Sequence, residues 1–286
     1  MTGAGCLTCV VTGATSGIGE AVAAGLAAQG AAVIGVARTV ESGDFAAGRI
    51  RDSVPDARIE MMVADLSVLD QVSALAEHIR SRTSRLDVLV LNAGVARPRL
   101  ELTPDGLEVD FATNHLSAFL LTQQLTGPLC ASAPARIVTV SSSAHRHVKD
   151  LDLDGLASGR GFHHMATYSA TKLLTLLFTT ELARQLAGSG VTVNAADPGF
   201  VRTGLGRGAT GAFGLFLKIT RPLQQTPAKG AATPLYLATS PEVAASSGGY
   251  YAKCRPSKTS SLAHDHVAAQ RLWALSSDLV TRKVHP

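Results

Sequence analysis

The chain is poor in cysteine, in charged residues and in long apolar runs, and each shortage excludes a class of protein. Of its 286 residues only 17% are charged while 46% are hydrophobic, a composition too apolar for an intrinsically disordered chain. Two of the four cysteines, Cys6 and Cys9, form a CxxC, but it lies inside an expected strand and no second pair completes a zinc site. We interpret all four as reduced thiols of a cytoplasmic protein.

Signals for membranes and nucleic acids are also missing. No signal peptide is visible, and no apolar stretch approaches the roughly 20 residues of a membrane span. Lysines and arginines are scattered, although the net charge is +4. We therefore expect no membrane anchor and no nucleic-acid binding, while the mild positive charge favours an anionic cofactor.

What the sequence contains is an alternation of short apolar strands and helices. The expected strands are Leu7–Thr12, Ala32–Ala37, Ile59–Ala64, Leu86–Leu91, Arg136–Ser141 and Val191–Ala196. The expected helices are Gly19–Gln29, Leu69–Arg82, Leu107–Leu125 and Tyr168–Ala187. This alternation predicts an α/β protein with a doubly wound parallel sheet, the Rossmann fold, whose ligand crevice lies at the carboxyl ends of the strands. We expect one domain over residues 1–286.

Two segments interrupt the alternation. Residues 143–166 form a polar stretch, which we expect to be a long loop. Residues 203–230 are rich in glycine and in apolar side chains such as Phe213 and Phe216, with no strand or long-helix pattern. We expect this second segment to be a lid that excludes water from a substrate crevice, the alternatives being a small satellite core or a partner surface.

The first strand ends in a glycine-rich turn, TGATSGIG at residues 12–19, and a helix follows. Glycine lets the chain turn tightly and lets a phosphate approach, and the helix that follows presents free N–H groups. Its position between the first strand and the first helix makes it a predicted phosphate-binding turn rather than a purely structural one.

Further motifs follow this turn along the chain. They are NAG at residues 92–94, Ser142 at a strand end, the YxxxK of Tyr168 and Lys172, and PG at residues 198–199. With TGxxxGIG they stand in the order found in the short-chain dehydrogenase/reductase family, which the chain resembles over nearly its whole length. The stretches VSSSAH (140–145), TPAKGA (226–231), GGYYAKC (248–254) and RLWALSSDLV (271–280) resemble the retinol-dehydrogenase-like branch.

The end of the second strand bears on the cofactor. An NAD-binding site usually has an acidic residue there, whereas this strand ends in Ala37 and Arg38, and a guanidinium suits the 2′-phosphate of NADP(H). The alternative is that Arg38 is a solvated charge. The cofactor residues that the turn and the resemblance imply are Gly13, Thr15, Ser16, Gly17, Ile18, Gly19, Arg38, Asp65, Leu66, Asn92, Ala93, Gly94, Tyr168, Lys172, Pro198, Gly199, Val201 and Thr203.

Tyr168 and Lys172 stand four residues apart, so they share one helix face if residue 168 is already helical. A free tyrosine has a pKa near ~10, and a neighbouring cation favours the phenolate. A unit charge about 4 Å away, at an effective dielectric near 20, supplies the ~4 kcal/mol that lowers the pKa by roughly 3 units. We therefore expect Lys172 to lower the pKa of Tyr168.

The resemblance implies the catalytic roles. Tyr168 would be the acid/base group, Lys172 would hold the nicotinamide ribose, Ser142 would bind the substrate oxygen, and Asn114 would hold a water of the proton relay. The neighbours Ser141 and Ser143 leave the serine assignment open by one position. The retinol-dehydrogenase-like branch often has a histidine before the PG turn, where this chain has Asp197.

The expected function is NADP(H)-dependent interconversion of a lipophilic aldehyde or ketone and its alcohol. A non-catalytic NADP-binding sensor or scaffold, or a C=C reductase, are the alternatives, and a homodimer is expected from the resemblance. We expect no metal: the Asp150, Asp152, Asp154 run lacks the final glutamate of a calcium loop, and the nearby histidines lack a supporting ligand pattern.

Overall fold

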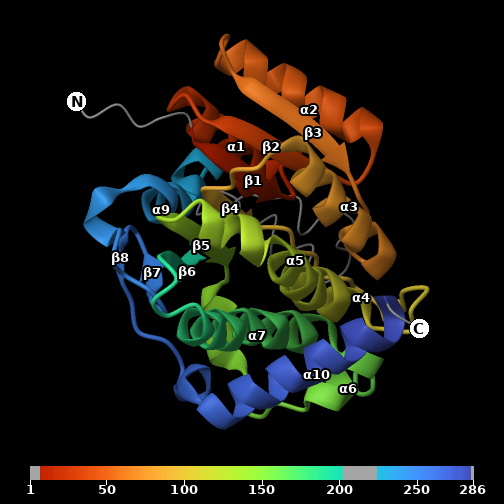
Figure 1. Ribbon diagram of the computed structural model, residues 1–286. Helices are drawn as coiled ribbons and strands as arrows, with labels where there is room; N and C mark the ends of the chain where they lie inside the picture. The colour runs from red at the N-terminus through yellow and green to blue at the C-terminus, as the bar shows by residue number, and fades with distance from the viewer. Residues whose placement is uncertain (1–6, 202–223, 285–286) are drawn as a thin grey trace.

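A computed structural model describes residues 7–201 and 224–284 of the chain (Figure 1). Its strands form one sheet in the order β3-β2-β1-β4-β5-β6-β7-β8, in which every neighbouring pair is parallel except β7 with β8. The strands are β1 (Thr8–Thr12), β2 (Ala32–Ala37), β3 (Arg58–Val63), β4 (Val88–Leu91), β5 (Ala135–Val140), β6 (Val191–Asp197), β7 (Tyr250–Ala252) and β8 (Arg255–Pro256). The predicted Rossmann fold is confirmed.

Helices cover both faces of the sheet (Figure 1). The layer on one face is α1 (Gly17–Ala28), α2 (Val40–Ser53) and α9 (Pro227–Thr239). The layer on the other is α3 (Leu69–Arg82), α5 (Ser117–Ala131), α7 (His164–Gln185) and α10 (His266–Val284). Neighbouring residues of β1 enter different cores, because Cys9 packs under α1 and Val10 under α3 and α5. Burial on both faces explains why these strands are continuous apolar runs.

The expected helix over 107–125 has a more complex form in the structure. A short helix, α4 (Val109–Phe111), leads into a π-helical turn, η1 (Ala112–Leu116), and α5 then continues to Ala131. A π-helical turn adds a residue to one turn and is frequent at functional sites. The turn contains Asn114 and His115, so the irregular part of the helix carries a predicted catalytic residue.

The expected loop over 143–166 is largely helical, and that prediction was wrong in its detail. It holds a 3₁₀ turn, η2 (Ser143–His147), and a helix, α6 (Leu153–Ser158), and α7 begins at His164. Asp152 caps α6 by accepting from the N–H of Gly155 and pairs with Arg160, which gives this residue of the acidic run a structural role. Two further 3₁₀ turns are η5 (Pro241–Val243) and η6 (Ser261–His264).

Most of the expected lid over 203–230 lies outside the described residues. At its end, Gln225 forms an isolated bridge with Val201, and residues 227–230 are the first turn of α9 rather than part of an irregular segment. Within the described part of the chain, none of the helices is both long and apolar enough to cross a membrane.

Candidate active site

The glycine turn lies between β1 and α1 at the carboxyl edge of the sheet. Gly13 and Gly17 have positive φ angles of 64° and 60°, which residues that carry a side chain rarely adopt. A Cβ on Gly19 would overlap the main-chain oxygen of Gly13 and the amide of Asn92. Ser16 precedes α1 without a capping side-chain bond, so the N–H groups of the first helical turn stay available to a ligand. This cradle fits a dinucleotide pyrophosphate.

Asn92 fastens this turn to the next strand. Its Nδ2 donates to the carbonyl oxygens of Thr12 and Gly13, at 2.9 and 3.3 Å, and its own N–H donates to Thr12 Oγ1 at 2.9 Å. The N–H of Ala93 also donates to Thr12 Oγ1. The ends of β1 and β4 are thereby held together at the carboxyl edge of the sheet.

Arg38 and Asp65 lie at the ends of β2 and β3, beside the glycine turn. Arg38 is exposed, and the described residues give it no hydrogen bond or ion pair. Asp65 is half-buried, and its Oδ1 accepts from the N–H and hydroxyl of Ser67, while Leu66 is buried. Arg38 is therefore free to meet an anionic group, whereas Asp65 shapes its own turn.

Tyr168 and Lys172 project from the same face of α7, because the helix already begins at His164. Lys172 Nζ lies 5.6 Å from the centre of the Tyr168 ring and donates to the carbonyl oxygen of Val140 at 3.0 Å. A Cβ on Gly94 would lie 3.3 Å from Lys172 Nζ. The helix thus brings both residues against the NAG turn and the end of β5.

Burial dominates the ionisation of this pair. It raises the pKa of Tyr168 to about 12, a rise that a hydrogen bond with Ser142 opposes and that Asp197 and Asp110 increase. Burial likewise lowers the pKa of Lys172 to about 8, although Asp110 and Asp197 act to raise it. The lowering of the Tyr168 pKa that was expected from Lys172 does not appear in the cofactor-free protein, because desolvation of the phenol dominates and Lys172 is not among the groups that shift this pKa.

The structure separates two of the three candidate serines, Ser141 and Ser142. Ser141 is buried, and its hydroxyl donates to the main-chain oxygen of Lys172 at 2.8 Å. Ser142 begins η2, accepts from the N–H of Ala144, and hydrogen-bonds with Tyr168. Ser141 is therefore occupied within the core, while Ser142 is the serine beside the phenol.

Asn114 is used for positioning. Its Oδ1 accepts from the N–H of Val95 at 2.7 Å, and its Nδ2 donates to the oxygen of Val95 and to Thr171 Oγ1. Both amide hydrogens are committed to protein acceptors, so a water of the expected relay would have to bind a carbonyl oxygen of this residue. Asn114 joins the NAG turn to the helix of Tyr168.

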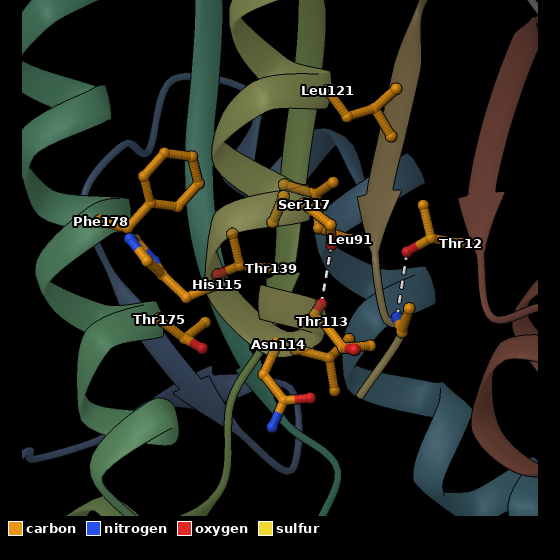
Figure 2. A pocket seen from close by; sticks show the side chains of 13 residues that line it. Thr12, Leu91, Thr113, Asn114, His115, Ser117, Leu121, Thr139, Thr175 and Phe178 are labelled. Atoms are coloured by element: carbon orange, nitrogen blue, oxygen red, sulfur yellow. Dashed lines mark hydrogen bonds between the residues drawn. The ribbon is translucent and has the colours of Figure 1, made fainter. Parts of the chain in front are cut away.

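A small cavity lies behind these residues, between the sheet and the helices α5 and α7 (Figure 2). Thr12, Asn114, His115 and Thr139 are among its lining side chains. Its free space is about 10 Å³, the lower limit for one water molecule, so it is too small for a substrate.

His115 lines this cavity, and burial lowers its pKa to about 3. Ser276 donates its one hydrogen to the oxygen of Leu272, so the 2.7 Å contact between His115 Nε2 and Ser276 requires His115 to be the donor. His115 Nδ1 is then a bare acceptor, and no described residue hydrogen-bonds it. A single water in the cavity would satisfy it.

The PG turn follows β6 and faces the glycine turn. A Cβ on Gly230 would contact both Val201 and Ile18, so the ends of β6, α1 and α9 meet. Gly199 has a φ of 77°, and its N–H donates to Asp197 Oδ1. Thr203 lies outside the described residues.

Sequence reasoning assigned no role to two carboxylates that are buried at this site, those of Asp110 and Asp197. Asp110 is fully buried, accepts only the N–H of Arg97 among the described residues, and has its pKa raised to about 7, first by burial and then by Glu108. Asp197 is buried at the end of β6. The sequence contains one signal for Asp110. It stands four residues before Asn114, and residues at this spacing lie on the same face of a helix.

Comparison with known families agrees with this geometry. The family model described as short chain dehydrogenase matches residues 7–211. The chain belongs to the short-chain dehydrogenase family. It is 39% identical to mouse retinol dehydrogenase 14, with 96% of this chain and 85% of the relative covered, and 40% identical to human retinol dehydrogenase 13, with 96% and 84% covered. The resemblance to the retinol-dehydrogenase-like branch is confirmed.

Solved structures of short-chain dehydrogenases share the fold. An uncharacterized protein from Mycobacterium Paratuberculosis is 32% identical with a TM-score of 0.77, covering 96% of this chain and 93% of the other. A variant of actinorhodin polyketide ketoreductase with NADPH has 28% identity and a TM-score of 0.67, covering 86% and 95%. A 3-ketoacyl-(acyl-carrier-protein) reductase from Brucella melitensis with NADH has 25% identity and a TM-score of 0.65, covering 86% and 96%. The chain is thus an oxidoreductase of a nicotinamide-binding family.

Proposed function

We propose that this short-chain dehydrogenase interconverts a lipophilic aldehyde or ketone and its alcohol with NADP(H), using Tyr168 as the acid/base group. The observation that carries the proposal is the meeting of Tyr168, Lys172 and Ser142 at the strand edge that also holds the glycine turn. A proton donor and a dinucleotide cradle at one edge are what carbonyl reduction requires.

The residues would divide the work as follows. The glycine turn would hold the pyrophosphate, Lys172 the ribose, and the bound cofactor supplies or accepts the hydride. The high pKa of Tyr168 keeps the phenol protonated at neutral pH, so it is ready to donate a proton to a carbonyl oxygen. Ser142, beside the phenol, would donate a hydrogen bond to the same oxygen and polarise it.

Preference for NADP(H) rests on Arg38. Its exposed guanidinium at the end of β2 has no partner among the described residues, and no carboxylate at position 37 competes for a ribose hydroxyl. A planar guanidinium binds a phosphate through two parallel hydrogen bonds. Similar structures hold NADPH in one case and NADH in another, so this chain's own strand end is the basis of the proposal.

A lipophilic substrate is supported by apolar side chains near the strand edge. Leu100 and Leu102, in the loop after β4, are 48% and 54% exposed, and Phe200, after β6, is 44% exposed. Exposed apolar groups of this size near a crevice favour an apolar ligand. The curated relatives bear the name retinol dehydrogenase, which suits the same substrate class. A homodimer and a cytoplasmic location stay predictions.

The test is a screen of NADPH oxidation against lipophilic aldehydes, ketones and quinones, with NADH assayed in parallel. Product analysis separates an alcohol from a saturated carbonyl when enones are included, and so distinguishes carbonyl reduction from C=C reduction. Tight NADPH binding without turnover on any compound, measured by calorimetry, would instead support the sensor or scaffold alternative. The proposed function requires turnover that Tyr168→Phe removes.

A further inference from the structure

Asp197 is a buried carboxylate for which the proposed chemistry has no use. It is the last residue of β6 and is 7% exposed. Tyr250 of β7 donates its hydroxyl to Asp197 Oδ2 at 2.6 Å, and the N–H of Gly199 donates to Oδ1 at 2.8 Å. Both oxygens therefore accept hydrogen bonds from neutral donors, and no described lysine or arginine forms a direct ion pair with this carboxylate. A buried charge without a direct ion pair is costly, which favours a cation nearby.

The position of Asp197 is next to the catalytic groups. The residue before it, Ala196, accepts at its main-chain oxygen from the N–H of Ser141 at 2.9 Å. Asp197 thus lies one residue beyond the paired ends of β5 and β6, level with Ser141 on the adjacent strand, whose hydroxyl donates to the main-chain oxygen of Lys172. The bond from Gly199 closes a tight turn on the carboxylate and fixes the PG turn.

The ionisable groups around Asp197 come from three elements. They are Tyr168 and Lys172 on α7, His145 on η2, and Tyr250 on β7. Arg146, also on η2, acts on His145 and Tyr250. Asp110, on α4, acts on the same Tyr168–Lys172 pair from another element. His145 is neutral, because Ser260 donates its N–H to Nε2, and Nδ1 then carries the hydrogen given to the oxygen of Ser142.

We propose that Asp197 is a positioning residue of this site: its buried carboxylate holds Lys172 in the protonated form and, through Gly199, fixes the PG turn. The proposal rests on the proposed function for its catalytic meaning. Burial lowers the pKa of Lys172 to about 8, and Asp197 and Asp110 are the groups that oppose this. Without Asp197, Lys172 loses its proton at a lower pH and ceases to be a cation for the ribose and the phenol.

The direct test follows the titration of Lys172 in the cofactor-free protein. The ¹³Cε resonance of lysine, assigned through Lys172→Arg, reports its protonation. In Asp197→Asn the side chain still accepts from Gly199 and still meets the Tyr250 hydroxyl, but the charge is gone. We expect the Lys172 midpoint to fall by about half a pH unit or more.

Three further variants make this test decisive. Asp197→Ser removes the charge with a different shape and must lower the midpoint too, which covers the case that Asp197→Asn fails to fold. Asp197→Glu restores the charge and should return the midpoint toward that of the wild type. Asp87→Asn removes a carboxylate that is equally buried but lies beside the amino end of β1, where Thr8 donates to it, and should leave the midpoint unchanged.

The activity arm separates the two proposals. In the direction of carbonyl reduction, the alkaline limb of kcat/KM should move to lower pH in Asp197→Asn by the same amount as the Lys172 midpoint. A folded Asp197→Asn protein with an unchanged Lys172 midpoint overturns the inference, as does an equal fall in Asp87→Asn. Absence of any turnover in the wild type would instead overturn the proposed function, while the Lys172 titration would still decide the role of Asp197.

Discussion

The two halves of the sheet differ in how they use side chains. The half made of β1, β2 and β3 forms its part of the site from main chain: a glycine turn, a helix N-terminus and one exposed arginine. Its ion pairs, Arg49 with Glu20 and Arg82 with Glu60, are largely exposed and contribute little to stability. The half made of β4, β5, β6 and β7 instead buries ionisable groups together, among them Asp110, Lys172 and Asp197.

This difference separates affinity from reactivity. A main-chain cradle recognises a ligand by shape and is insensitive to pH, because peptide groups do not titrate. Buried acids and bases act on one another through a medium of low polarity, so their protonation states depend strongly on burial. We expect changes in the first half to alter binding of the cofactor, and changes in the second half to alter turnover and its pH dependence.

The largest expected effect tests the second half. Tyr168→Phe should lower kcat for carbonyl reduction by about 10³-fold, in the range for loss of a general acid, because no other donor replaces the phenol. The dissociation constant of NADPH should change by less than about twofold. Steady-state kinetics and calorimetry measure the two. Tyr236→Phe, which changes a half-buried tyrosine of α9 that donates to Glu242, is the matched control and should leave both quantities unchanged. Substantial activity in Tyr168→Phe would sink the mechanism.

The next effect tests the first half. Gly19→Ala should weaken NADPH binding by about 10- to 100-fold, because its Cβ overlaps the Gly13 oxygen and the Asn92 amide and forces the cradle apart. Gly48→Ala, on a helix with open space around it, is the control and should leave binding unchanged. If both variants bind NADPH like the wild type, the turn does not form the cofactor site.

A smaller effect tests the exposed charge of the first half. Arg38→Asp should lower the preference for NADPH over NADH by about tenfold or more, since it exchanges a phosphate partner for an acceptor of ribose hydroxyls. Dissociation constants of both cofactors measure this. Arg271→Asp makes the same charge change at an exposed position of α10 and should not alter the preference. A wild-type preference for NADH would contradict the role of Arg38.

The smallest effect concerns stability in the second half. Because His115 has a pKa of about 3 when folded and about 6.5 when unfolded, the unfolded chain gains a proton first as the pH falls. The free energy of unfolding therefore decreases below about pH 6.5. The contribution of His115 to this decrease is about 1 kcal/mol between pH 6.5 and pH 5.5. His115→Gln keeps a donor for Ser276 but does not titrate, so urea unfolding at the two pH values should show a loss smaller by that amount. An identical loss in both proteins would show that His115 is not a neutral buried group.

The sequence predicted the elements that depend on local pattern. Strands such as Ala32–Ala37 are buried on both faces and therefore consist of uninterrupted apolar residues. The sequence did not reveal α2, because its buried face consists of Ile50 and the small residues Gly43, Ala46 and Ala47, while Val40 and Phe45 are both 65% exposed. It also did not reveal α9, because Pro227 and Pro234 resemble breaks, although a proline is well accommodated in the first turn of a helix.

For the site, as for the fold, the sequence predicted the features that depend on local spacing and not those that depend on packing. The motif around Tyr168 predicted the shared helix face, since spacing alone determines it. The direction of the Tyr168 pKa could not be predicted, because it depends on how much water reaches the phenol, and that depends on packing from β5, α4 and β6. The carboxylate of Asp197 gained its meaning only once Tyr250 and Gly199 were found to hold it, from positions 53 and 2 residues away in the chain.

The bond between His145 and Ser260 has a consequence for the order in which the protein matures. Ser142 and the glycine turn are translated early, but the partner that fixes the His145 tautomer comes 115 residues later. Ser276, the partner of His115, comes later still. The two buried histidines at the reactive edge therefore gain their hydrogen-bond partners only from the last part of the chain to be synthesised, so the completion of this edge depends on that part of the chain.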